Sequence, residues 1–588
     1  MTPNRRQTSP NTLVRIRTWY ILIVAVFGII VLRLFYLQVI KHDYYKTSAL
    51  SGQYKEYEIA PVRGVIEAHD GERVVPIVLN EKKFTLFVDP KYVIDLPDTA
   101  DRIQRVVGGS VAEYEKAMKT DSRYVILKKK LSRETAKQID ELKILGVGTR
   151  AESLRTYPQG NFASQILGFV NDEAQGKYGI EQALDDKLKG TPGQLKAITD
   201  AQGVPLVANE DNIITKPIDG DRIVLSLDIS MQQQLEQILK TGLDNARSKS
   251  GSVLIMDPNN GKIKAMANYP SYDPSKFSEV KDISVFNNGT VSAPLEVGSI
   301  MKPLTAAAAL DNGSIKPNQT YYDPSFFKVD NETITNIEED GGAATRSVSD
   351  ILTLSLNTGA TWLLMQMGGG KINEQARITW HDYMTNHYQL GKKTNIEQGY
   401  EEPGFIPDPK KGYGLNIQFA NTSFGQGMSA TPLQMGGALS AAINGGTYYQ
   451  PSLVDSTVKP DGTSNDSKPV IVKKNVVSPS TSKSLVGFME QVVNKNYQLY
   501  KMKQLRPNYS VGGKTGTAQI TKPEGGYYDD RFNGLFMGFV GGDKPQYVIV
   551  VRVNEPGIAG YAGAQAAAPI FTSSVDMLIN NFAVSPRS

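Results

Sequence analysis

The first residues with the means to do chemistry are Ser299 and Lys302, in the stretch PLEVGSIMKPLTAAAALDNG. The alanine-rich run and the stop signal Asp-Asn-Gly predict a helix that starts near Ser299. Positions three apart share a helix face, which places Lys302 beside the Ser299 hydroxyl. A serine becomes a strong nucleophile when a base takes its proton, and a lysine does so only when neutral. Burial or a second cation lowers the pKa of a lysine toward that state.

A lone Ser-x-x-Lys has little weight, because Ser278 with Lys281 and Ser480 with Lys483 match it too, in polar, turn-prone sequence. A second pattern, Ser-Leu-Asn, lies 56 residues after the first serine, within SVSDILTLSLNTGATWLL. Its hydroxyl and amide, two positions apart on a tight turn, can point into one cleft. By itself this pattern is equally consistent with a polar turn. Its two polar residues are Ser355 and Asn357.

The third pattern is Lys-Thr-Gly-Thr, residues 514–517, within SVGGKTGTAQI. A cation and two hydroxyls on a strand edge make a cradle for a carboxylate, and Gly516 lets a substrate chain approach the backbone. The main alternative is a nucleotide-binding loop, which also ends in Gly-Lys-Thr. That motif requires glycine at position 508, where this chain has Asn508, so the alternative fails.

The elements that must position these motifs follow Asp221. DRIVLSLDI, SVLIMDPNNGKIKAMANYP, GLFMGFVGG and QYVIVVRVNEP are typical of β-strands, the second being two strands joined by an Asn-Asn-Gly turn. MQQQLEQILKTGLDNARS has helical periodicity. Strands and helices do not alternate strictly, which favours an antiparallel sheet flanked by helices over a parallel sheet. We therefore expect an α+β domain over residues 221–588.

Residues 41–220 mix strand-like runs (KFTLFVDP, RYVILKKKL) with charged helical stretches such as LSRETAKQIDELKIL. No clustering of titratable side chains there indicates chemistry, which favours a pedestal or interaction module. The stretches RTYPQGNFASQILGFV and GIEQALDDKLKG are rich in glycine and turn formers and predict a junction between domains. An elongated mixed α/β pedestal is the expected structure.

Residues 19–40, WYILIVAVFGIIVLRLFYLQVI, form an apolar run of 22 residues. As a helix it rises about 33 Å, enough to cross a bilayer. Four arginines and no acid precede it, so the positive-inside rule leaves residues 1–18 in the cytoplasm and exports the rest. The alternative is a cleaved signal peptide, but no small-x-small site follows before Lys41 and the run is longer than usual for one. We expect one uncleaved membrane helix.

Composition excludes other chemistry. The chain has no cysteine, which rules out disulfides, thiolate metal sites and a cysteine nucleophile. Its four histidines form no His-Glu-x-x-His pattern, so we expect neither metal nor cofactor. The net charge of +4 is accounted for by the arginines before the apolar run. A nucleic-acid binder concentrates positive charge in its folded part, and we expect no nucleic acid as partner.

Taken together, the three patterns match in order and spacing the signature of penicillin-binding proteins and serine β-lactamases. The chain resembles class B (monofunctional) penicillin-binding proteins over nearly its whole length. The similarity includes RLFYLQV, APVRGVIEAHDG, the two junction stretches, VGSIMKP, SLNTG, FGQGMSATPLQM and GGKTGTAQ. One departure is Ile300, where the family usually has threonine after the serine. Another is Asn395, where a Lys-Thr-Gly element is often found.

The resemblance implies a D,D-transpeptidase that cross-links peptidoglycan. Ser299 attacks the carbonyl between the terminal D-alanines of a donor stem peptide, with Lys302 as base. Ser355 relays a proton to the leaving amine, and Asn357 holds Lys302 and the substrate amide. The charge of Lys514 helps to keep Lys302 neutral.

Substrate binding is implied in the same way. Thr515 and Thr517 bind the terminal carboxylate, and Gly516 lies between them. The backbone N–H groups of Ser299 and Thr517 form the oxyanion hole. An amine of a neighbouring stem peptide then resolves the acyl-enzyme, and β-lactams mimic the donor.

The implied partners are lipid-linked or nascent peptidoglycan, β-lactam antibiotics, the cell (inner) membrane, a multi-span glycosyltransferase and other division or elongation proteins. The compact stalk and the FGQG segment favour a septal role over elongation. A β-lactamase usually lacks a stalk and a retained anchor. A β-lactam-sensing receptor needs a larger cytoplasmic or multi-span part, and a bifunctional enzyme needs a glycosyltransferase domain before residue 220. A scaffold without catalysis is the remaining alternative, although all three motifs are intact.

Overall fold

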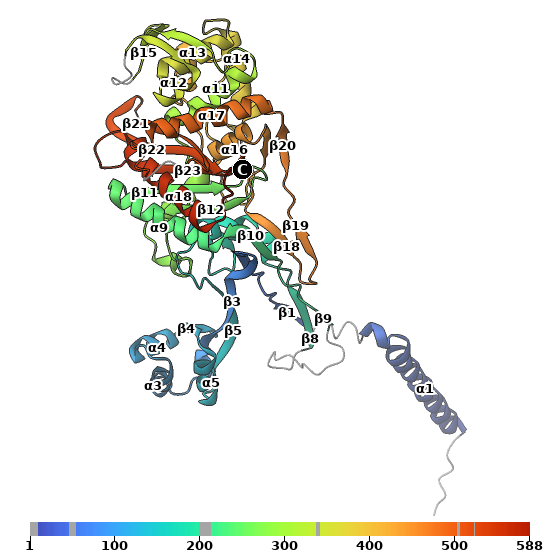
Figure 1. Ribbon diagram of the computed structural model, residues 1–588. Helices are drawn as coiled ribbons and strands as arrows, with labels where there is room; N and C mark the ends of the chain where they lie inside the picture. The colour runs from blue at the N-terminus through green and yellow to red at the C-terminus, as the bar shows by residue number, and fades with distance from the viewer. Residues whose placement is uncertain (1–9, 46–53, 199–212, 337–341, 503–505, 523) are drawn as a thin grey trace, which may run out of the picture. The chain divides into compact units, whose positions relative to one another are not determined.

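The computed structural model describes residues 10–45, 54–198, 213–336, 342–502, 506–522 and 524–588 (Figure 1). The chain forms two compact units. One comprises residues 1–61 and 191–218, and the other comprises residues 62–190 and 219–588. In this division the chain leaves the first unit after residue 61, returns to it at residue 191 and leaves it again after residue 218.

The first unit contains one long apolar helix, α1 (Pro10–Phe35), continued by a π-turn over Tyr36–Ile40. Its span Leu13–Ile40 has a mean hydropathy of 2.5 and is exposed along its length, long and apolar enough to cross a membrane. The predicted apolar helix is confirmed, although helix already begins at Pro10, a residue favoured in a first helical turn. Residues 1–9 of the predicted tail lie outside the described residues. The unit also has a three-stranded antiparallel sheet of β1 (Tyr54–Ile59), β8 (Gly193–Ile198) and β9 (Ile213–Thr215).

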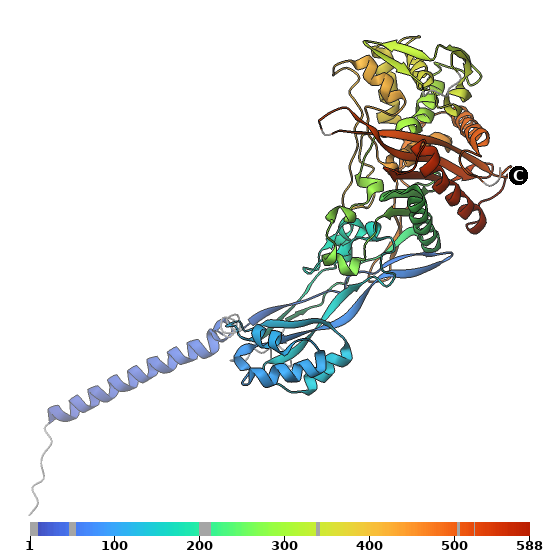
Figure 2. The ribbon, with the colours of Figure 1, turned by 90° about the vertical axis from the view of Figure 1, so that its left-hand side faces the viewer.

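The second unit is organised around a five-stranded sheet whose neighbours are all antiparallel. This confirms the predicted α+β sheet, including the hairpin with the Asn-Asn-Gly turn. In spatial order its strands are β12 (Ile263–Tyr269), β11 (Ser250–Met256), β23 (Pro545–Asn554), β22 (Tyr527–Gly541) and β21 (Ser510–Thr521). The β21–β22 hairpin, red in Figure 2, extends past the body of the sheet.

Helices cover both faces of this sheet. A Cβ at Gly251 would lie 2.9 Å from Leu243 of the helix α9 (Ile229–Ala246), whereas Leu254 lies against Gly436 of α16 (Pro432–Ile443). Odd and even positions of a strand point to opposite faces, so α9 and α16 lie on opposite sides. The helix α18 (Ala568–Asn581) packs with α9, and α17 (Pro479–Asn496) packs against β21.

A helical part adjoins the β21 edge of the sheet. Its central helix, α11 (Lys302–Asp311), is buried from Lys302 to Leu310, and its alanines permit close packing against its neighbours. The other helices of this part are α12 (Val348–Thr353), α13 (Asn357–Met367), α14 (Glu374–Asp382) and α15 (Leu415–Ser423). Two small antiparallel sheets of two strands complete it, β13 (Thr320–Asp323) with β16 (Ala344–Ser347) and β14 (Phe326–Val329) with β15 (Glu332–Thr335).

A second sheet runs from this unit's middle into its smaller lobe. Its strands are β19 (Ser464–Asp466), β18 (Val454–Val458), β10 (Arg222–Asp228), β2 (Ile66–Asp70), β3 (Arg73–Val88) and β4 (Val125–Leu131), with β5 (Val147–Thr156) also paired to β3. The smaller lobe has its own apolar core, built around Leu86 and Ile103. The helices that close it are α3 (Leu96–Val107), α4 (Val111–Met118) and α5 (Arg133–Glu141).

Short elements join these parts. They are α6 (Ser164–Leu167), β6 (Phe169–Val170), β7 (Gly176–Lys177), α7 (Gly179–Ala183), α8 (Asp185–Leu188), α10 (Gly289–Ser292), β17 (Thr447–Tyr449) and β20 (Ile471–Lys474).

Buried ion pairs hold the junction that the sequence predicts. The fully buried Glu181 carboxylate accepts hydrogen bonds from Arg155 Nε at 2.7 Å and Arg63 Nη2 at 2.6 Å, and Asp185 pairs with Arg63 at 2.7 Å. No local pattern predicts this titratable cluster, because its members are up to 122 positions apart and meet only in the fold. Buried charges that are all paired make this a structural joint.

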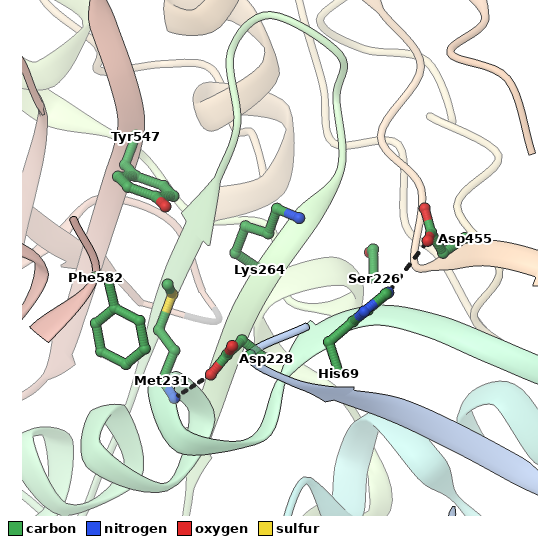
Figure 3. Close-up of a pocket in the computed structure, with 9 residues that line it drawn as sticks. His69, Ser226, Asp228, Met231, Lys264, Asp455, Tyr547 and Phe582 are labelled. Carbon is green, nitrogen blue, oxygen red and sulfur yellow. Dashed lines mark hydrogen bonds and ion pairs between the residues drawn. The ribbon is translucent and has the colours of Figure 1, made fainter. Parts of the chain in front are cut away.

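A cavity of about 230 Å³ lies where the β2–β3 hairpin meets β10, β12 and β18 (Figure 3). Several polar side chains in its wall are bonded within the protein. His69 Nε2 lies 3.1 Å from Asp455 Oδ2, and Asp228 Oδ1 accepts the Met231 N–H at 2.8 Å as the N-cap of α9. We interpret this cavity as a packing seam between the second sheet and the first.

Candidate active site

A cleft of about 660 Å³ lies between the β21 edge of the first sheet and the helical part. Side chains or backbone from all three sequence motifs line it. Those motif residues are Ser299, Ser355, Asn357, Lys514, Thr515 and Thr517. The fold therefore brings together residues that are up to 218 positions apart in the chain.

Ser299 lies in a single 3₁₀ turn, Gly298–Met301, which leads directly into α11 at Lys302. Gly298 has φ +53° and donates its N–H to the Gly425 carbonyl at 3.0 Å. A Cβ at Gly298 would lie 2.8 Å from the Thr517 carbonyl oxygen. Only glycine meets both demands, a left-handed φ and contact with β21. The turn thus holds the half-buried serine against the third motif.

Lys302 is fully buried at the start of α11. Its Nζ donates hydrogen bonds to Ser355 O at 2.5 Å, Ser355 Oγ at 3.2 Å and Asn357 Oδ1 at 2.9 Å. Burial, and then the charge of Lys514, lowers the pKa of Lys302 well below its usual value. Within the described ranges no carboxylate pairs with this lysine, so no negative charge opposes the shift toward the neutral amine.

The second motif forms a strained turn. Ser355 has φ +59°, an uncommon backbone conformation for a residue with a Cβ, and α13 begins two residues later at Asn357. Asn357 Nδ2 donates to the Thr335 carbonyl at 3.1 Å, which leaves its oxygen directed at Lys302. The turn aims a hydroxyl, a carbonyl and an amide oxygen at Lys302 Nζ.

The third motif occupies the part of β21 beside the cleft. Thr515, Thr517 and Gln519 are half-buried and line the cleft, as alternation along a strand requires. Lys514 is only 1% exposed, and burial lowers its pKa to about 7. Its Nζ donates to Thr515 O at 3.1 Å and Thr515 Oγ1 at 3.3 Å. Thr517 Oγ1 accepts the Gly563 N–H at 3.2 Å.

The surroundings of Gly516 differ from the expectation of an open approach for substrate. A Cβ there would lie 2.9 Å from the Val297 carbonyl and 3.1 Å from Ile300 Cγ2. The space left by the absent side chain is therefore filled by the turn that holds Ser299. Glycine is needed here because β21 and that turn are in contact.

Ser299 Oγ has no hydrogen-bond partner among the residues that the structure describes. Catalytic hydrogen bonds are often loose before substrate binds, so the free hydroxyl is compatible with a nucleophile. Other cleft residues escaped the sequence interpretation. Aromatic side chains form much of the wall, and no motif marks them because they come from separate segments. They are Phe424, Tyr500, Phe532 and Tyr561, of which only Phe424 lies in a stretch that the resemblance had indicated.

Comparison with known proteins agrees with this geometry. A family model described as "Penicillin binding protein transpeptidase domain" matches residues 251–576, and one described as "Penicillin-binding Protein dimerisation domain" matches residues 58–225. Stage V sporulation protein D of Bacillus subtilis is 32% identical over 98% of this chain and 87% of that protein. Peptidoglycan D,D-transpeptidase FtsI of Escherichia coli K12 is 25% identical, over 94% of this chain and 89% of that protein.

The fold is shared with solved structures as well. Penicillin binding protein 2X from Streptococcus thermophilus superposes with a TM-score of 0.72 at 23% identity, covering 91% of this chain and 83% of that one. Fold and cleft together define a penicillin-binding transpeptidase domain. The chain belongs to the penicillin-binding proteins, and its dimerisation domain followed by one transpeptidase domain matches the class B type that the sequence resembles.

Proposed function

We propose that this protein is a serine-type peptidoglycan D,D-transpeptidase that joins stem peptides through an acyl-enzyme on Ser299. The observation that carries the proposal is the buried, acid-free environment of Lys302, one turn from Ser299 and hydrogen-bonded to Ser355 and Asn357. Such a lysine is neutral enough to act as a base. Relatives named peptidoglycan D,D-transpeptidase support the substrate class, peptides ending in D-alanyl-D-alanine.

The first half-reaction is acylation. Neutral Lys302 takes the proton of Ser299 Oγ as that oxygen bonds to the carbonyl carbon between the two D-alanines. The carbonyl oxygen becomes an oxyanion that accepts hydrogen bonds from the backbone N–H groups of Ser299 and Thr517, each worth about 3 kcal/mol. The C–N bond then breaks, and Ser355 passes the proton from Lys302 to the departing amine of D-alanine. Serine is left as an ester of the donor peptide.

The donor's terminal carboxylate is held at the third motif. Thr515 and Thr517 present hydroxyls to the cleft, and Lys514 supplies positive potential beside them. The same charge disfavours a proton on Lys302. One cation thus binds the substrate and keeps the base in its active form.

The second half-reaction transfers the acyl group. The amine of a neighbouring stem peptide attacks the ester carbonyl, loses a proton to Lys302, and expels Ser299 Oγ, which regains a proton. The product is an amide cross-link and free enzyme. A β-lactam has a strained amide where the donor has its scissile bond, so it acylates the same serine and has no leaving group that departs.

The setting of this chemistry is the outer face of the cell membrane. The span Leu13–Ile40 anchors the chain in the inner membrane, and the arginines before residue 19 keep the N-terminus in the cytoplasm. A multi-span glycosyltransferase that supplies nascent glycan is the expected partner. We assign the protein to septal synthesis, which the compact stalk and the FGQG segment favour. Elongation is the second candidate.

Release of D-alanine from a stem-peptide donor, with and without an acceptor amine, tests the reaction. The full-length protein in detergent releases D-alanine and forms the cross-linked dimer, and Ser299→Ala does neither. Ser278→Ala, in an exposed chance match to the same motif, is the matched control and keeps full activity. Equal loss in both variants, or cross-linking by Ser299→Ala, contradicts the proposal.

A further inference from the structure

Glu296 lies three residues before Ser299 and takes no part in the reaction described above. Its Oε1 accepts two hydrogen bonds, from the Gly427 N–H at 2.9 Å and from the Tyr527 hydroxyl at 2.8 Å. Its Oε2 is buried and has no partner among the described residues. A buried carboxylate with an unsatisfied oxygen is costly, and such groups in native proteins call for a functional explanation.

The bond to Gly427 clamps the turn that holds Ser299. Residues 296–298 and 425–427 are joined at two points, by this bond and by the Gly298 N–H donated to the Gly425 carbonyl at 3.0 Å. The two turns are in direct contact, because a Cβ at Gly425 would lie 2.1 Å from the Gly298 carbonyl oxygen. The same two segments are also joined by Leu295 and Ala430, which exchange backbone hydrogen bonds at 3.1 and 3.0 Å. The Ser299 N–H therefore has a rigid support on one side.

The bond to Tyr527 clamps the facing wall. Tyr527 is the first residue of β22 and pairs with Thr521, four residues beyond Thr517 on β21. Thr517 in turn contacts the turn that holds Ser299, because a Cβ at Gly298 would lie 2.8 Å from the Thr517 carbonyl oxygen. One carboxylate oxygen thus bonds both to the support of Ser299 and to the hairpin that bears Thr517.

We propose that Glu296 is a positioning residue that sets the separation of the two oxyanion-hole donors, the backbone N–H groups of Ser299 and Thr517. This inference rests on the proposed function, which places an acyl carbonyl between those donors. Such donors act only when they lie about 2.7–3.1 Å from the developing oxyanion, and removal of one slows catalysis about 100- to 1,000-fold. Without the Glu296 bonds the turn that holds Ser299 and the hairpin that bears Thr517 are held less firmly, which weakens the hydrogen bonds of both N–H groups to the oxyanion without deleting either. We therefore expect a loss of about 10- to 100-fold in acylation rate.

The experiment uses full-length protein acylated by a β-lactam carrying carbon-13 at its reacting carbonyl. Two quantities are measured, the acylation rate constant at saturating β-lactam and the infrared stretching frequency of the acyl-enzyme carbonyl. Hydrogen bonds to a carbonyl oxygen weaken its double bond and lower this frequency. A merely structural role would change stability without moving that band.

Glu296→Ala removes both hydrogen bonds at Oε1. It is expected to lower the acylation rate constant about 10- to 100-fold, to change the noncovalent dissociation constant little, and to move the carbonyl band to higher frequency. Tyr527→Phe removes one bond and gives a smaller shift in the same direction, and the double variant adds little to Glu296→Ala. Glu296→Gln keeps an acceptor oxygen and restores most of the rate. Tyr528→Phe, the next position of the same hairpin, is the control and leaves both quantities unchanged.

An unchanged carbonyl band in Glu296→Ala overturns the inference, whatever the rate. So does a Tyr527→Phe variant that loses rate with no shift of the band. These outcomes leave the proposed function standing, because both require that the wild-type protein be acylated. Absence of any acyl-enzyme in the wild type is the failure of the proposed function itself.

Discussion

Replacing Lys514 with methionine is expected to stabilise the protein near neutral pH while it destroys acylation. Lys514 is 1% exposed, and no carboxylate pairs with it in the described part of the chain. Burial lowers its pKa from 10.5 to about 7. At about 1.4 kcal/mol per pH unit, this difference corresponds to about 4–5 kcal/mol of stability lost at low and neutral pH. Methionine has similar length and no charge, but it leaves the Thr515 carbonyl without its donor, so we expect a gain of about 2–4 kcal/mol.

The sign of the pH dependence follows from proton binding. Folded Lys514 holds its proton less tightly than the unfolded chain does, so the unfolded state binds more protons between about pH 7 and pH 10.5. The stability of the wild type therefore rises with pH across that window. The methionine variant lacks this slope. The gap between the two proteins is widest below pH 7 and closes toward pH 10.5.

Thermal unfolding of the full-length protein in detergent, from about pH 6 to pH 10, measures this gap. Each kcal/mol raises the Tm by roughly 2 °C in a large domain. Lys474→Met, at an exposed position of β20, is the matched control and leaves the Tm unchanged. A methionine variant at position 514 that melts below the wild type at pH 7 refutes the reasoning, and so does a gap independent of pH.

Further predictions concern the base, the turn, the junction and the cell. Acylation falls as Lys514 loses its charge near pH 7, and Lys514→Arg, which keeps its charge, moves this falling limb to higher pH in a stopped-flow profile. Gly298→Ala puts a Cβ 2.8 Å from the Thr517 carbonyl, and we expect it to lose most fluorescent-penicillin labelling while its circular dichroism is unchanged. Glu181→Ala leaves two buried arginines without their shared partner and destabilises the protein by about 3–5 kcal/mol in thermal melts, whereas Asp186→Ala, in an exposed ion pair, has little effect. Depletion of the protein gives filamentous cells if the role is septal; round cells in the microscope would contradict that assignment.

The sequence was sufficient where local patterns decide the structure. The β11–β12 hairpin follows from two apolar runs around Asn-Asn-Gly, and α9 follows from its periodicity. The antiparallel character of the first sheet could be predicted, because strands and helices do not alternate strictly along the chain. The strand order was not foreseeable, since β23 pairs with β11, which lies about 300 residues earlier in the chain.

The residues of the candidate site could be predicted from sequence motifs, but their arrangement in space could not. Ser299, Lys302 and the Lys-Thr-Gly strand are recognisable because their spacing matches a known signature. The left-handed φ of Ser355 and the contact of Gly516 with the Ser299 turn arise from tertiary packing, which no local pattern encodes. The same holds for Glu296, whose two partners are 131 and 231 positions away.

The division of the chain into two compact units follows from no local sequence pattern. The sequence predicts boundaries at residues 18, 40 and 220, and the compact units divide the chain at residues 61, 190 and 218. The cause is the path of the chain. β1 pairs with β8, some 140 residues later, so residues before and after the small lobe belong to one unit.

Mass spectrometry of the penicillin-treated protein tests the central claim most directly. The intact mass should rise by that of one penicillin, and peptide mapping should place the adduct on Ser299, with none on Ser278 or Ser480. An adduct on another residue, or a protein that stays unmodified at saturating penicillin, would contradict the assignment of Ser299 as the nucleophile.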